Sequence, residues 1–201
     1  LENTLMRTIY LDCFCGISGD MCLGALVDTG VPLDIIREAL GRLPLHGYRL
    51  ESHTVQRAGI SASKVDVVRD EEHAHPHRGL HEVLEIIYEG DLSSNVQQRS
   101  CDVFRALAEA EARVHDSEPD EVHFHEVGAV DAICDIVGTV VGMDYLGADR
   151  ILFSPVSLGG GVVEAAHGRL PVPAPATLEL LRGIPTKGGP VQVELTTPTG
   201  A

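Results

Sequence analysis

The apolar period of the chain changes at Gly128, from the two-residue repeat of an extended segment to the repeat of a helix. Val122 and Phe124 alternate with His123 and His125, so both imidazoles are expected on one face of an extended segment. From residue 129 to residue 145 the apolar positions follow a helical repeat, at Val130, Ile133, Val137, Val140 and Val141. An extended segment that passes through a glycine turn into a helix is typical of folds that combine strands and helices.

The same stretch is rich in side chains that bind metals or carry protons. His123, His125 and Glu126 precede the predicted helix, and Asp131 and Asp135 lie four residues apart on one of its faces. Two imidazoles followed by two aligned carboxylates suit a divalent metal or acid–base chemistry. The alternative is a capped helix with solvated acids and ordinary surface histidines. Spacing alone does not separate the two interpretations.

Strand-like and helix-like segments alternate along most of the chain. Strands are predicted at residues 8–14, 48–56, 61–68, 150–157 and 191–195, and helices at 21–28, 34–43, 81–88, 95–115, 129–145 and 177–182. The two strands before residue 69 are separated by Arg57-Ala58-Gly59, which favours antiparallel pairing. We therefore expect an α/β fold in which a mixed sheet is flanked by helices.

A glycine-containing loop, Gly16 to Asp20, follows the first predicted strand and opens a helix. Strand, loop and helix N-terminus together form the arrangement that holds a phosphate on backbone N–H groups. The alternative is a plain turn in which Ser18 or Asp20 caps the helix. The candidate cofactor-binding residues are Gly16, Ser18, Gly19 and Asp20, with Thr196 and Thr197 from a similar loop near residue 200. Asp12 lies within the apolar strand, where an unpaired carboxylate is costly, so we expect it to have a partner or a metal.

Residues 70–81 change the character of the chain abruptly, because they combine histidines and acids with almost no apolar residue. The histidines of this segment are His73, His75, His77 and His81. Such tracts bind nickel, copper or zinc loosely, and Pro76 opposes a regular helical array of ligands. We interpret the segment as a flexible loop that collects metal, and not as a catalytic centre.

Composition narrows the class of protein. A formal net charge of −15 over 201 residues opposes a nucleic-acid partner and suits cations. The five cysteines include no C-x-x-C pair, so neither a disulfide framework nor a structural zinc site is indicated. No apolar run approaches the ~18 residues of a membrane span, and no signal peptide is recognised at the start, so a cytoplasmic protein without a membrane partner is expected.

Three segments together resemble the LarC family of nickel-insertion proteins. They read LDCFCGISGDM, HFHEVGAVDAICDIVG and LPVPAPATLELL, and the terminal ELTTPTGA adds to them. The resemblance covers essentially the whole chain. It implies insertion of nickel into pyridinium-3,5-bisthiocarboxylic acid mononucleotide, at the expense of CTP, to make the nickel pincer nucleotide cofactor of lactate racemase.

The resemblance extends only to the N-terminal part of that family, whose members are about twice as long. It implies that residues 1–201 form a single N-terminal domain and that CTP, with manganese or magnesium, belongs to a C-terminal domain absent from this chain. The expected partners are nickel, the mononucleotide and that C-terminal domain, and a homo-oligomer is left open.

Roles for individual residues follow from their chemistry within this framework. Catalysis is assigned to His125, Glu126 and Asp131. Metal binding is assigned to Asp12, His123, His125 and Asp135, together with the four histidines of residues 70–81. One alternative is a nickel-storage or metallochaperone module that catalyses nothing. A weaker alternative is a metal-dependent phosphohydrolase.

Overall fold

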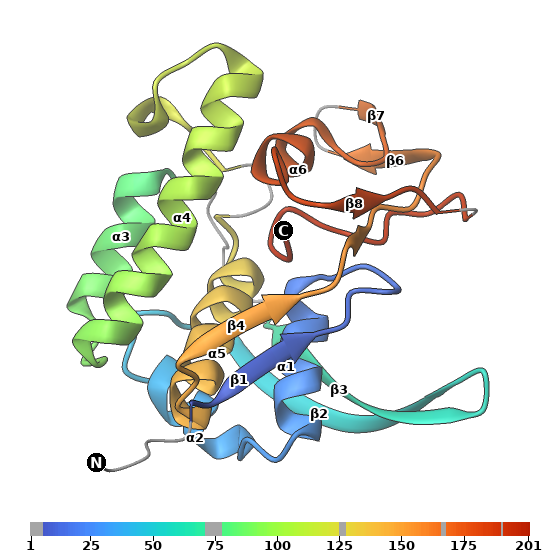
Figure 1. The fold of residues 1–201 in the computed structure, drawn as a ribbon. Helices are drawn as coiled ribbons and strands as arrows, with labels where there is room; N and C mark the ends of the chain where they lie inside the picture. The colour runs from blue at the N-terminus through green and yellow to red at the C-terminus, as the bar shows by residue number, and fades with distance from the viewer. Residues whose placement is uncertain (1–5, 71–77, 125–127, 166–167, 190) are drawn as a thin grey trace.

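The computed structural model describes residues 6–70, 78–124, 128–165, 168–189 and 191–201 (Figure 1). Its helices are α1 (Gly19–Asp28), α2 (Leu33–Leu40), α3 (Leu80–Glu89), α4 (Ser94–His115), the 3-10 turn η1 (Pro119–Glu121), α5 (Val130–Leu146) and α6 (Pro175–Leu180). Its strands are β1 (Thr8–Leu11), β2 (Tyr48–Arg57), β3 (Ile60–Arg69), β4 (Arg150–Phe153), β5 (Val156–Ser157), β6 (Val162–Ala165), β7 (Gly168–Pro171) and β8 (Thr186–Lys187). No helix in these ranges is long and apolar enough to cross a membrane.

The strands pair in two-stranded sheets. β1 pairs with β4 and β5 with β8 in parallel, whereas β2–β3 and β6–β7 are antiparallel. The predicted α/β class is confirmed, but the parallel and antiparallel pairs occupy separate small sheets instead of one mixed sheet. The predicted hairpin before residue 69 is also confirmed: Ala58 and Gly59 connect its strands with positive φ angles of 49° and 80°. Positive φ at both central residues suits the right-handed twist of the two strands.

Helix α5 lies at the centre of the main hydrophobic core. Ile133 and Val137 are fully buried, and α5 packs against α1, α2 and α4. Its contact with α1 depends on Gly138 and Gly142, where a Cβ would lie 2.9 Å and 2.8 Å from leucine side chains of α1. The helical period of residues 129–145 therefore predicts the central helix correctly, and its glycines allow α1 to lie close against it.

Three predicted strands differ from the structure. The segment at 150–157 divides at Ser154 and Pro155 into β4 and β5, which pair with different strands. The segment at 8–14 keeps its alternation, with Cys13 buried and Phe14 exposed, but its ladder with β4 ends at Leu11. Residues 191–195 do not form a strand; their backbone makes one isolated bridge, between Glu194 and Gly159. An alternating pattern fixes which side chains face inward, whereas a strand also requires a neighbour in register.

Candidate functional site

An acidic cavity of about 230 Å³ lies where the N-terminal ends of α1 and α5 meet the segment at 194–199. We call it the acidic cavity. Its lining consists of Ser18, Gly19, Asp20, Asp131, Ala132, Asp135, Glu194, Thr197, Pro198 and Thr199. Four of these residues are acids, and they come from three segments that are far apart in the sequence.

The two helices bring three aspartates to this cavity. Asp20 is in the first turn of α1 and Asp131 in the first turn of α5, and Asp135 follows one turn later on the same face. The helices approach closely because Gly19 has no side chain: a Cβ there would lie 2.6 Å from the Asp135 Cβ. Close packing at Gly19 thus places the Asp135 carboxylate beside the start of α1.

Backbone hydrogen bonds hold in place the segment at 194–199, which lines the acidic cavity together with the two helices. The Ile17 N–H donates to the Leu195 carbonyl oxygen at 2.9 Å, and the Thr197 N–H donates to the Ile17 carbonyl oxygen at 3.2 Å. Thr196 is fully buried, and its hydroxyl donates to the Ser157 carbonyl oxygen at 2.7 Å. These bonds anchor residues 195–197 against the loop before α1, and they present Thr197 to the cavity.

Asp135 carries the clearest electrostatic signal of the site. Burial, together with the nearby charges of Asp20 and Asp131, raises its pKa from the ordinary 3.8 to about 7, and burial is the largest of these causes. Its Oδ1 atom is buried, and within the described ranges it has no hydrogen-bond partner. A proton or a cation would relieve this arrangement, because either would reduce the repulsion among the three carboxylates.

The predicted phosphate-binding residues separate into two groups. Ser18, Gly19, Asp20 and Thr197 line the acidic cavity, whereas Gly16 and Thr196 do not. The backbone N–H groups of Gly16 and Ile17 already donate, to Cys13 and Leu195 respectively. Carboxylates surround the remaining residues of the loop, so a phosphate there would need a cation beside it.

Asp12 lies away from the three aspartates. It is exposed, directly after β1, and it borders a second cavity between β1 and α1. The premise that Asp12 is buried within a strand is therefore wrong, whereas its role as a metal ligand stays a prediction. The structure does not bring it into the lining of the acidic cavity.

The predicted alternation before α5 is confirmed for residues 122–124. Val122 and Phe124 are 6% and 1% exposed, and His123 between them is exposed. This segment lies beside the start of α3: His123 forms an isolated antiparallel bridge with Gly79, and the Phe124 N–H donates to the Arg78 carbonyl oxygen at 3.1 Å. His125 and Glu126 lie outside the described residues, as do His73, His75 and His77.

His81 is the only predicted metal ligand of residues 70–81 whose position is described. It is exposed in the first turn of α3, with its Nδ1 3.6 Å from the Glu85 Oε1. The His-rich segment joins the described chain at Arg78, which contacts Phe124. The predicted metal-collecting segment is therefore joined to the fold directly beside His123.

The described ranges contain no group of three or more His, Cys, Asp or Glu side chains arranged to hold a metal ion. The acidic cavity is therefore not a preformed coordination shell.

Two polar residues of the cavity, Glu194 and Thr199, were not among the site residues proposed from the sequence. The only available signal was their place in the terminal ELTTPTGA motif. Local sequence assigned Glu194 to a strand, and its position at the cavity results from the pairing of Ile17 with Thr196.

Comparison with known proteins gives a consistent result. A family model described as nickel insertion protein matches residues 9–201. A putative nickel insertion protein from Geotalea uraniireducens is 53% identical over 98% of this chain and 50% of its own length. A pyridinium-3,5-bisthiocarboxylic acid mononucleotide nickel insertion protein from Geobacillus kaustophilus is 47% identical over 98% of this chain and 50% of its own length.

A similar protein from Syntrophotalea carbinolica, also a putative nickel insertion protein, is 50% identical over 98% of this chain and 49% of its own length. This chain thus spans about half the length of the curated relatives it matches. No solved structure matches it. The family match covers more than nine-tenths of the sequence, and the chain therefore belongs to the nickel insertion protein family.

Proposed function

We propose that this domain takes part in the insertion of nickel into pyridinium-3,5-bisthiocarboxylic acid mononucleotide. The name of the Geobacillus kaustophilus relative supports this substrate. The product would be the nickel pincer nucleotide cofactor of lactate racemase. A cytoplasmic enzyme of the full family length would make it at the expense of CTP. Nickel is a substrate of this reaction.

The reaction needs a proton acceptor. Nickel becomes bonded to one ring carbon and two sulfur atoms, and the ring C–H bond breaks as the nickel–carbon bond forms. The electron pair of that C–H bond passes to nickel, so the proton leaves to a base. Asp135 suits this task because its pKa of about 7 lets it gain and lose a proton near neutral pH. The single observation that carries the proposal is the position of Asp135, which lines the acidic cavity with a buried Oδ1 atom that has no hydrogen-bond partner among the described residues.

The other acids of the cavity favour the ion. Asp20 and Asp131 border the same space and add negative charge where nickel would approach the substrate. We assign them to attracting the cation, and Asp135 to accepting the proton, which reverses the roles assigned to Asp131 and Asp135 from the sequence. Ser18 and Thr197 border the same space, where the Ser18 hydroxyl donates to Asp20 and the Thr197 hydroxyl is hydrogen-bonded with that of Thr199; we assign both to positioning the substrate phosphate beside a cation.

Delivery of nickel is assigned to the histidines. The segment at 70–81 would collect the ion, and His123 lies where this segment joins the fold. His125 and Glu126, which follow in sequence, would pass the ion toward α5. CTP, with manganese or magnesium, would bind the part of the longer relatives that this chain does not match, which is also the proposed partner domain.

The test uses a full-length protein that carries this domain, with nickel, the mononucleotide, CTP and magnesium or manganese. Asp135→Asn preserves shape and removes the proton acceptor, so the rate of nickel-nucleotide formation is expected to fall by about 100-fold or more. Asp91→Asn alters an exposed aspartate between α3 and α4 and should leave the rate unchanged. Normal product formation by the Asp135→Asn protein would refute the role of Asp135, and normal formation by His125→Ala would refute that of His125.

The storage alternative retains one supporting observation: the described ranges contain no preformed three-residue metal site, whereas the His-rich segment supplies many imidazoles. Deleting residues 70–81 separates the two functions. An insertion enzyme should still form product at a high nickel concentration without this segment. A storage module would lose all nickel binding, and substitutions of Asp20, Asp131 or Asp135 would have no effect on the nickel that the intact protein binds.

A further inference from the structure

The paired strands β1 and β4 form an incomplete layer. Parallel sheets in α/β folds are normally covered on both faces. Here Tyr10 and Phe14 are 62% and 65% exposed, and Leu152 and Phe153 of β4 are also exposed. Figure 1 shows this ribbon crossing in front of α5 and α1. The opposite face of β1 carries Leu11 and borders cavities shared with α1 and α5, and we call it the near face.

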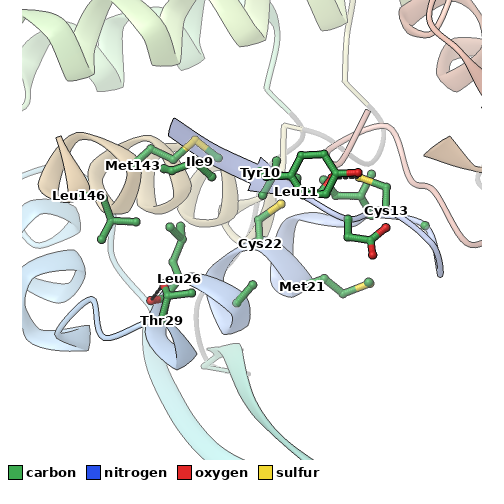
Figure 2. A pocket seen from close by; sticks show the side chains of 14 residues that line it. Ile9, Tyr10, Leu11, Cys13, Met21, Cys22, Leu26, Thr29, Met143 and Leu146 are labelled. Carbon is green, nitrogen blue, oxygen red and sulfur yellow. Dashed lines mark hydrogen bonds between the residues drawn. The ribbon is translucent and has the colours of Figure 1, made fainter. Parts of the chain in front are cut away.

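Two apolar cavities border that face. One, of about 380 Å³, lies between β1 and α1 and includes Ile9, Met143 and Leu146 (Figure 2). The other, of about 290 Å³, is bounded by β1, α4, α5 and the last residues of the chain. We call the second one the α4–α5 cavity. Its apolar wall includes Val103, Leu107, Ile136, Val140 and Met143.

The final residues form a hydrogen-bonded turn with a helix-like bond at the edge of the α4–α5 cavity. The Ala201 N–H donates to the Thr197 carbonyl oxygen at 3.0 Å, which is the i to i−4 hydrogen bond of an α-helix. Thr197 stands at the N-cap position and Pro198 at the first helical position, where both residue types are favoured. Pro198, Thr199, Gly200 and Ala201 all border the cavity.

The start of this turn is fixed to the rest of the fold. Gly200 lies so close to the loop before α1 that a Cβ there would be 2.2 Å from the Ile17 carbonyl oxygen. Ile17 is in turn bonded to Leu195 and Thr197. A helix that continues the turn therefore has a defined origin between the acidic cavity and the α4–α5 cavity, since Pro198 and Thr199 border both.

We infer that the α4–α5 cavity receives an apolar face of an α-helix that begins at Pro198 and is supplied by the residues following Ala201 in the longer proteins of this family. Its apolar side chains, spaced three and four residues apart, would pack on Val103, Val140 and Met143. The same helix would cover the near face of β1 through Leu11, which borders the cavity. The curated relatives are long enough to supply it, because this chain matches only about half of their length.

The test places a fluorescent reporter in the wall, because the chain contains no Trp. Val103→Trp is introduced at a position that is 37% exposed in α4. The substitution is made in two proteins, the 201-residue chain and the same chain with an extension of ~20 residues. The extension is the segment that follows the matched part of the Geotalea uraniireducens relative, and any Trp in it is replaced by Phe. The emission maximum should move to shorter wavelength in the extended protein only. Ile60→Trp, at the first residue of β3 and 70% exposed, is the matched control and should not change.

Unchanged emission from Val103→Trp on extension would overturn the inference. A blue shift that appears in the unextended chain as its concentration rises would also overturn it, because a second copy would then cover the wall. Amide hydrogen exchange of the unsubstituted proteins provides a measurement that does not depend on the reporter. Exchange of the β1 amides should slow at least tenfold in the extended protein, and equal exchange in both proteins would contradict the helix.

Discussion

The substitution Asp135→Asn should stabilise the protein at alkaline pH. Folding raises the pKa of Asp135 from 3.8 to about 7, a difference of about 3 units and so about 4 kcal/mol at most. The folded state therefore holds this proton more tightly than the unfolded state does. The stabilising effect of the proton is complete below pH 4, declines as pH rises from about 4 to about 7, and is absent above pH 7.

Asparagine removes this pH dependence because it carries no charge at any pH. We expect the free energy of unfolding to rise by about 2–4 kcal/mol at pH 8 and to change little near pH 4. The value of about 2 kcal/mol applies if Asp20 and Asp131 relax around the charged Asp135 of the unsubstituted protein. Urea unfolding measured by circular dichroism at pH 4.5, 6 and 8 would detect it, since this gain corresponds to about 1–2 M in the midpoint. Asp91→Asn, at an exposed site, should leave the midpoint unchanged at each pH.

Added nickel provides a second test of the same prediction. A cation held by the folded protein stabilises it by mass action, so added nickel should raise the midpoint of the unsubstituted protein at pH 8. Asp135→Asn should reduce that increase because one carboxylate beside the ion is lost. If Asp135→Asn failed to raise the midpoint at pH 8, or changed it equally at pH 4.5 and pH 8, the assignment of a raised pKa to this carboxyl would be wrong.

Three further substitutions test the packing that positions the site, each by urea unfolding at pH 7. Gly138→Ala should destabilise by about 1–3 kcal/mol, because its Cβ would lie 2.9 Å from the Leu23 side chain, and a neutral effect would contradict the close α1–α5 contact. Phe124→Ala should destabilise by about 3–5 kcal/mol because the ring is buried, whereas His123→Ala, at the neighbouring exposed residue, should change stability by less than about 0.5 kcal/mol. Equal effects of the two substitutions would contradict the alternation of buried and exposed side chains at residues 122–124. Ser93→Ala should cost about 1 kcal/mol by removing the oxygen that accepts from the first turn of α4, and Ser93→Asp should restore most of it.

The sequence by itself determined the features that depend on local periodicity. The helical repeat after Gly128 predicts α5, and the alternation of Val122, His123 and Phe124 predicts which side chains are buried. The hairpin around Ala58 and Gly59 follows in the same way from turn chemistry. These predictions succeed because neighbouring residues set the direction of each side chain, whatever packs against them.

Only the tertiary structure decided which of the candidate residues share a site. Asp20 and Asp135 are more than one hundred residues apart and meet because Gly19 lets α1 touch α5. Asp12, another aspartate only eight residues before Asp20, is exposed to solvent where β1 ends. The raised pKa of Asp135 likewise comes from burial and from carboxylates on another helix. Desolvation and the interaction between charges depend on every group that the fold brings near a residue, so residue type and spacing along the chain do not specify them.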